Sequence, residues 1–105
     1  RYVADKRESA VCYAEFCKGN EDITFFTEPA DCKSNYWLNA VVLKDKAAQL
    51  DFLEYTNDHG VMTRPVWELM NRLPMFEHCE TDGLENTEWL ADRVVNIPSS
   101  VRLDK

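Results

Sequence analysis

The sequence has few of the residues and runs on which several classes of function depend. Only 3 glycines and 2 histidines occur among its 105 residues, and none of the glycines belongs to a phosphate-binding loop. No G-x-S-x-G motif is present, so a self-contained hydrolase has little support. No apolar run approaches the roughly 18 residues that span a bilayer. These absences exclude a P-loop NTPase and a chain with an apolar membrane-spanning helix.

Positive charge is also scarce. The sequence contains 12 Lys and Arg against 19 Asp and Glu, for a net charge of -7. The basic residues are scattered singly or in pairs, whereas binding to a phosphate backbone needs them clustered. We therefore expect no nucleic-acid partner and no anionic membrane surface.

The four cysteines do not have the spacing of a metal or redox site. No C-x-x-C occurs, Cys12 and Cys17 are separated by four residues, and His78 and Cys79 are adjacent. We expect no metal site, and we interpret the cysteines as reduced thiols packed like small hydrophobic residues in a cytoplasmic protein. A zinc or disulfide protein is the weaker alternative.

Apolar residues are plentiful, at 45% of the chain, so one folded domain is expected. Helical spacing of apolar residues predicts a leading helix over residues 3–18, ended at Gly19. A short β-type run covers 23–26. The stretch 36–43 is rich in aromatic and β-branched residues and predicts a strand buried on both faces.

A second helix is predicted from Asp45, its N-cap, to about His59, with Gly60 as its stop. A second clear strand follows over 61–64. Residues 66–84 are irregular, with a short helical turn around 67–73. Asn86 or Thr87 then caps a last helix that runs to about residue 94. The order strand, helix, strand predicts an α+β fold in which helices cover a small sheet in two layers.

Two segments are candidate binding positions. Arg64, held extended by Pro65 and followed by Trp67, has the chemistry of a clamp for a carboxylate or phosphate beside a stacking surface. A structural ion pair is the more common use of such an arginine in an acidic protein. Asn35 and Tyr36 lie at the mouth of the predicted strand, where binding residues are typical. A transition from loop to strand with a buried Trp is the more common origin of such a segment.

The same segments, taken in order, resemble the C-terminal part of the DegT/DnrJ/StrS-type aminotransferases, and are most similar to the branch that aminates 4-keto sugars on a nucleotide. The resemblance covers nearly the whole chain and rests on these segments: Lys6-Arg7 with Tyr13, Ser34-Asn35-Tyr36-Trp37-Leu38, Phe52-Leu53 with Gly60-Val61, Thr63-Arg64-Pro65-Val66-Trp67, Leu73-Pro74-Met75-Phe76, and Val94-Val95-Asn96-Ile97-Pro98-Ser99-Ser100.

The resemblance implies a homodimeric enzyme that uses pyridoxal phosphate (PLP) and transfers an amino group from glutamate to a keto-sugar nucleotide, in polysaccharide and amino-sugar biosynthesis. It implies that the chain, residues 1–105, is the small C-terminal domain, with a leading helix over 1–19 and a body over 20–105. The large PLP-binding domain, with the catalytic lysine, would precede Arg1. The isolated fragment would then be inactive, with no catalytic, cofactor-binding or metal residue of its own.

By the same resemblance, Asn35, Tyr36, Arg64 and Trp67 would contact the substrate. The family often has an aromatic-Pro-x-His arrangement near the last two of these residues, and Arg64-Pro65-Val66-Trp67 departs from it. The position of Arg64 is therefore better supported than its role. The alternative is a stand-alone α+β module that binds a ligand or a protein, with Arg64 and Trp67 as its pocket.

Overall fold

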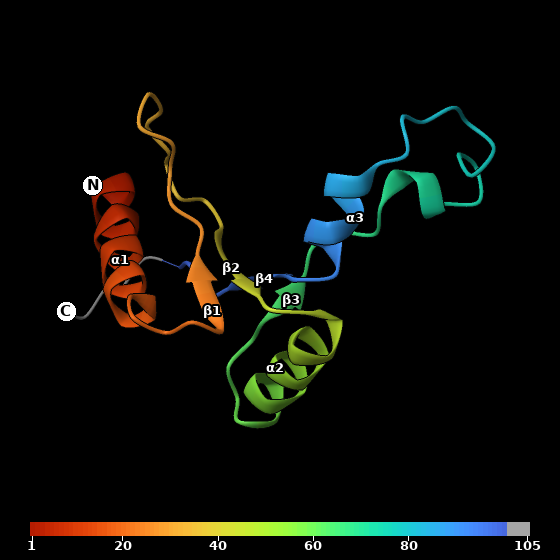
Figure 1. Ribbon diagram of the computed structural model, residues 1–105. Helices are drawn as coiled ribbons and strands as arrows, with labels where there is room; N and C mark the ends of the chain where they lie inside the picture. The colour runs from red at the N-terminus through yellow and green to blue at the C-terminus, as the bar shows by residue number, and fades with distance from the viewer. Residues whose placement is uncertain (101–105) are drawn as a thin grey trace.

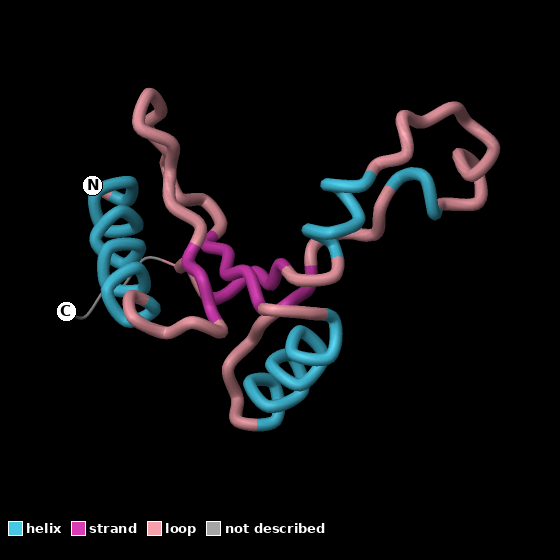
Figure 2. Tube along the Cα trace, viewed as in Figure 1, coloured by secondary structure: helices cyan, strands magenta, loops and turns pink. Residues whose placement is uncertain are grey.

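The computed structural model describes residues 1–100, whose strands form one small sheet with helices around it (Figures 1 and 2). A single 3₁₀ turn, η1, interrupts the long connection before the last helix. In chain order the elements are α1 (Tyr2–Cys17), β1 (Ile23–Phe25), β2 (Asn39–Leu43), α2 (Lys46–Asp58), β3 (Arg64–Pro65), η1 (Met70–Arg72), α3 (Glu85–Ala91) and β4 (Val94–Ile97).

The sheet is antiparallel and its strand order is β1-β2-β4-β3. The last strand of the described chain, β4, thus lies between β2 and β3, which precede it in the sequence. Helices α1 and α2 pack on the sheet, whereas the connections over 26–38 and 66–84 extend away from it (Figure 1). The predicted α+β fold, with helices on a small sheet, is confirmed.

Alternation along β2 separates the two faces of the sheet. Asn39, Val41 and Leu43 are buried, and they share a face with Val95 of β4, on which side chains of α1 and α2 pack. Ala40 and the other outward-facing residues are only half-buried. The prediction that this strand is buried on both faces is therefore wrong, because both packed helices lie on the same side.

Helix α2 begins and ends where its sequence predicts. The Asp45 side chain accepts a hydrogen bond from the Ala48 N–H at 2.8 Å and caps α2. At the other end, Gly60 has φ +81°, and the Val61 N–H donates to the Thr56 carbonyl at 2.8 Å. This is the Schellman arrangement, and it turns the chain directly into the approach to β3.

Two predicted strand boundaries are wrong by a few residues. The strand predicted over 36–43 begins only at Asn39, because Tyr36 has φ +50° and breaks the extended chain. The strand predicted over 61–64 is shorter and begins later: it consists of Arg64 and Pro65, because only these two residues pair with β4. Amino-acid composition does not indicate which residues will pair with a neighbouring strand.

The C-terminal prediction needs the largest correction. Helix α3 follows Leu84, whose φ is +52°, and neither Asn86 nor Thr87 caps it. The helix ends at Ala91 instead of continuing to Val94. Residues 94–97, for which no strand was predicted, form the strand β4, because β2 and β3 supply hydrogen-bonding partners on its two sides.

The cysteines lie differently from the prediction. All four are free thiols, but Cys12, Cys32 and Cys79 are exposed, and only Cys17 packs against the core. The interpretation that the thiols act as packed hydrophobic residues is therefore wrong for three of them. Within residues 1–100, no group of His, Cys, Asp and Glu side chains gathers as metal ligands, and no helix has the length and apolarity to cross a membrane.

Candidate functional site

The first candidate segment, Ser34 to Trp37, forms the last turn before β2. The Asn35 side-chain oxygen accepts the Trp37 N–H at 2.9 Å, and the Ser34 hydroxyl accepts the Tyr36 N–H at 2.9 Å. Such turns within the chain fix the backbone while leaving side chains outside. Asn35 and Trp37 are exposed, and the Asn35 amide nitrogen has no hydrogen-bond partner within residues 1–100.

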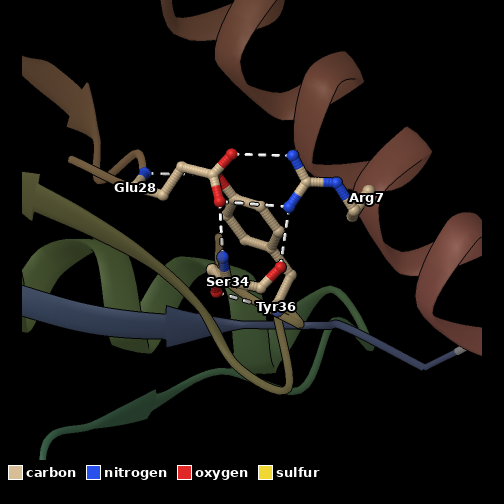
Figure 3. Close-up of polar contacts among 4 residues, drawn as sticks. All are labelled: Arg7, Glu28, Ser34 and Tyr36. Carbon is tan, nitrogen blue, oxygen red and sulfur yellow. Dashed lines mark hydrogen bonds and ion pairs between the residues drawn. The ribbon is translucent and has the colours of Figure 1, made fainter. Parts of the chain in front are cut away.

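The backbone of this segment is tied to α1 by a cluster that the sequence did not single out as functional (Figure 3). The Arg7 guanidinium donates to both carboxylate oxygens of Glu28, at 2.7 and 3.0 Å, and to the Ser34 carbonyl at 2.7 Å. Glu28 also accepts the Ser34 N–H. The Tyr36 hydroxyl accepts the Glu28 N–H at 3.2 Å, and the Arg7 guanidinium carbon lies 5.5 Å from the centre of the Tyr36 ring.

This cluster holds Tyr36 in a conformation that it would not adopt alone. A left-handed backbone costs a residue with a side chain about 1–2 kcal/mol. Here the hydroxyl, the backbone N–H and the ring of Tyr36 are each engaged. The sequence pointed to Arg7 and to the Ser34–Tyr36 segment separately, but it gave no signal for Glu28 or for the contact between them, because the spacing from Arg7 to Glu28 has no period.

The same contacts keep the Glu28 carboxyl ionised. Hydrogen bonds from Arg7 and from the Ser34 N–H lower the pKa of Glu28 from 4.5 to about 2, with a smaller contribution from the charge of Lys33. Reciprocally, the hydrogen bond and charge of Glu28 raise the pKa of Arg7. The cluster is therefore a charged, bidentate ion pair at neutral pH.

The acid stability of the chain should depend on Glu28. Because its pKa is lower in the folded state, its stabilising contribution is complete above pH 4.5 and is lost as the pH falls through about 2. We expect Glu28→Gln to lower the melting temperature at neutral pH, and the difference from the wild type to shrink across that window. Thermal unfolding followed by circular dichroism at a series of pH values measures it.

Glu68→Gln is the control for this series, since it removes a carboxylate from the exposed pair with Arg72, whose N–O distance is 3.9 Å. Exposed pairs of this kind contribute little to stability. A wild-type advantage over Glu28→Gln that stays constant down to pH about 2 would contradict the assigned ion pair.

The second candidate segment begins with Arg64 in β3. Its guanidinium donates to the Asn57 side-chain oxygen at 3.3 Å and to the Thr63 carbonyl at 3.0 Å. No carboxylate within residues 1–100 forms an ion pair with it, and the residue is exposed. The structural ion pair considered for Arg64 is therefore not formed in the described part of the chain, and its positive charge faces outward.

Strand register relates the two segments. Arg64 lies opposite Asn96, and Asn96 lies opposite Ala40 on its other side. Neighbouring strands are about 5 Å apart, so the backbones of Arg64 and Ala40 are about 10 Å apart. Arg64 is thus near the edge of the sheet formed by the strand ends, at the point where the Asn35–Tyr36 segment enters β2.

Trp67 lies farther from this edge. It follows the other end of β3, and its side chain is 75% exposed. The structure therefore brings Asn35, Tyr36 and Arg64 towards one edge of the sheet and places Trp67 beyond the opposite end of a two-residue strand. No hydrogen bond within the described residues joins Trp67 to the other three.

The segment after β4 also lies at this edge. The Ser99 hydroxyl donates to the Trp37 carbonyl at 2.8 Å, and the Lys6 ammonium donates to the Ser99 carbonyl at 2.7 Å. The Tyr13 hydroxyl donates to the Pro98 carbonyl at 2.8 Å. Residues 96–100 are therefore the end of β4 followed by a segment fixed to α1.

The described residues alone do not fit PLP, the cofactor that the resemblance implies. A phosphate group is held best at a helix N-terminus free of negative charge. Here each helix carries an acidic residue at that end: Asp5 in α1, Asp45 as the cap of α2 and Glu85 in α3. The lysines before residue 101 lie on α1, in loops or at the start of α2.

Comparison with known proteins places the whole chain in one family. The sequence profile of the DegT/DnrJ/EryC1/StrS aminotransferase family matches residues 1–105. No curated protein sequence matches the chain significantly.

Solved structures show the same fold. PseC from Helicobacter pylori, an aminotransferase involved in the biosynthesis of pseudoaminic acid, is 16% identical with a TM-score of 0.84, over 97% of this chain and 28% of that protein. The aminotransferase TlmJ from Streptoalloteichus hindustanus is 20% identical with a TM-score of 0.83, over 93% and 26%. The sugar aminotransferase CalS13 from Micromonospora echinospora is 23% identical with a TM-score of 0.76, over 93% and 26%. The chain spans about a quarter of the length of these proteins.

Proposed function

Because this chain belongs to the DegT/DnrJ/EryC1/StrS aminotransferase family, we propose that it is the small C-terminal domain of a PLP-dependent sugar aminotransferase. The full-length enzyme transfers an amino group from glutamate to a keto-sugar nucleotide for polysaccharide or amino-sugar biosynthesis. It acts in the cytoplasm as a homodimer. The observation that carries the proposal is the family match over all 105 residues.

In this proposal the domain binds substrate and leaves the cofactor chemistry to the rest of the enzyme. The acidic helix N-termini support this division, because they would repel the cofactor phosphate. The catalytic lysine lies outside residues 1–105, and the chain alone is inactive.

Four residues of the chain bind substrate in this proposal. Arg64, with its unpaired positive charge, holds the diphosphate of the sugar nucleotide or the carboxylate of glutamate. Asn35 and Tyr36, fixed by their own turn and by α1, contact the sugar nucleotide from the same edge. Trp67, exposed beyond β3, packs on a ring of the substrate.

Cofactor absorbance and amino transfer test this function together. The full-length protein that contains this chain should show the long-wavelength absorbance of lysine-bound PLP and should transfer label from ¹⁵N-glutamate to a keto-sugar nucleotide, measured by mass spectrometry. The isolated chain, incubated with PLP, should show neither.

A stable PLP absorbance band in the isolated chain would refute the proposal that the cofactor is bound by the rest of the enzyme and not by this domain. Absence of both activities from the full-length protein would instead favour the stand-alone binding module.

A further inference from the structure

The connection between β1 and β2, residues 26–38, is attached to α1 at two points six residues apart. Arg7 reaches both of them, since its guanidinium donates to the Glu28 carboxylate and to the Ser34 carbonyl. Glu28 accepts the Ser34 N–H and so joins the two points to each other. One planar group therefore fixes the beginning and the end of the connection against the helix (Figure 3).

The chemistry of these contacts is specific to an arginine and a carboxylate. A guanidinium presents several donors in a fixed plane, whereas a lysine ammonium is a single point of charge. Two donors face the two oxygens of Glu28, and one of them also faces the Ser34 carbonyl. Glu28 in turn uses one oxygen for both Arg7 and Ser34, so replacing either residue loosens both attachment points.

The cluster is not part of the hydrophobic core. The side chains of Arg7 and Glu28 are 33% and 22% exposed, and neither belongs to the buried core of the described residues, which consists of Ala10, Phe25, Val41, Leu43 and Val95. Most residues between 26 and 38 are exposed. Loss of the cluster should therefore free the connection without unfolding the sheet.

We propose that Arg7 and Glu28 are positioning residues that set where Asn35 and Tyr36 meet the sugar nucleotide. Arg7 positions Tyr36 directly, because the Tyr36 ring lies beneath the Arg7 guanidinium. Glu28 acts through its backbone, whose N–H donates to the Tyr36 hydroxyl and which the Glu28 side chain holds in place by its ion pair with Arg7. Asn35, its neighbour, carries no contact of its own to α1 and follows the backbone that Ser34 fixes. This inference rests on the proposed function for the identity of the ligand and for its contact with Asn35 and Tyr36.

Two measurements on the full-length enzyme test the proposal with Arg7→Gln and Glu28→Gln. In hydrogen exchange followed by mass spectrometry, the peptide covering residues 27–37 should exchange about tenfold faster, while peptides of α2 stay unchanged. In steady-state kinetics, the KM for the sugar nucleotide should rise about tenfold with kcat within a factor of about two, because the segment contributes to binding rather than to chemistry. The KM for glutamate should not change.

Matched variants separate positioning from general damage. Arg7→Lys keeps the charge but loses the planar fork, so its exchange and its KM should lie between those of the wild type and of Arg7→Gln. Arg72→Gln removes the cation of the exposed pair with Glu68 and should leave both measurements unchanged. Circular dichroism checks that every variant is folded.

The outcomes distinguish this inference from the proposed function. Unchanged exchange over 27–37 in both variants overturns the positioning role, whatever the kinetics show. Faster exchange with an unchanged KM for the sugar nucleotide overturns the placing of Asn35 and Tyr36 at the ligand. Absence of any amino transfer by the wild type disproves the proposed function, and with it the ligand named here, while the exchange measurement still decides whether Arg7 and Glu28 hold the segment.

Discussion

Replacing Arg64 with alanine is expected to weaken the binding of one substrate by about 2 kcal/mol or more, which is a roughly 30-fold rise in its dissociation constant. The reason is that its guanidinium is exposed and has only neutral partners, Asn57 and the Thr63 carbonyl, within residues 1–100. A charged ligand group is therefore free to pair with it. Binding of the sugar nucleotide and of glutamate, measured separately by titration of the full-length enzyme, shows which substrate it holds.

The controls for Arg64 follow from the geometry. Arg64→Lys keeps the charge without the bidentate fork and should recover part of the lost affinity. Arg72→Ala removes another exposed arginine, one that is paired with Glu68, and should leave both affinities unchanged. If Arg64→Ala binds both substrates normally, Arg64 has only the structural role of joining the turn after α2 to β3.

Replacing Gln49 with alanine is expected to lower the free energy of unfolding by about 2–4 kcal/mol. Gln49 is fully buried, at 0% exposure, on the sheet-facing side of α2. Its amide nitrogen donates to the carbonyls of Ala91 and Val94, both at 2.9 Å, and so connects α2 to the end of α3 and the start of β4. The substitution removes both hydrogen bonds and opens a cavity. Chemical denaturation monitored by circular dichroism measures the loss.

Two further variants identify the cause. Gln49→Leu restores most of the volume but donates no hydrogen bond, so a comparable loss with leucine assigns the effect to the hydrogen bonds. Glu54→Ala changes an exposed residue on the same helix and should have little effect. Full stability of Gln49→Ala would show that the contact between α2 and the α3–β4 junction is dispensable.

The elements that the sequence predicted well are those defined by local chemistry. The Asp45 cap, the Gly60 stop and the apolar face of α1 each depend on residues within one or two turns, so their positions could be read directly. The position of strand β4 could not be read from the sequence in this way. Nothing local distinguishes Val94–Ile97 from a helix end, and the segment becomes a strand only because β2 and β3 lie on either side of it.

The candidate site was predictable to a similar extent. Arg64 stood out because proline follows it and fixes the chain direction, and the structure places it at a sheet edge with an unpaired charge. The Arg7 cluster escaped notice because it joins residues from a helix and a distant loop. Whether Asn35, Tyr36, Arg64 and Trp67 bind substrate stays a prediction.

The strand order has a consequence for how the chain is synthesised. β1 and β2 can pair as soon as they leave the ribosome, but β3 has no partner until β4, the last strand of the described chain, has emerged. The growing chain must therefore carry β3 and one side of β2 without a partner strand until residues 94–97 have been translated. Pairing between distant segments is slow, and unpaired strand edges attract other chains. We expect β4 to be the step that commits this domain to its fold, and the step at which a nascent chain most needs chaperone protection.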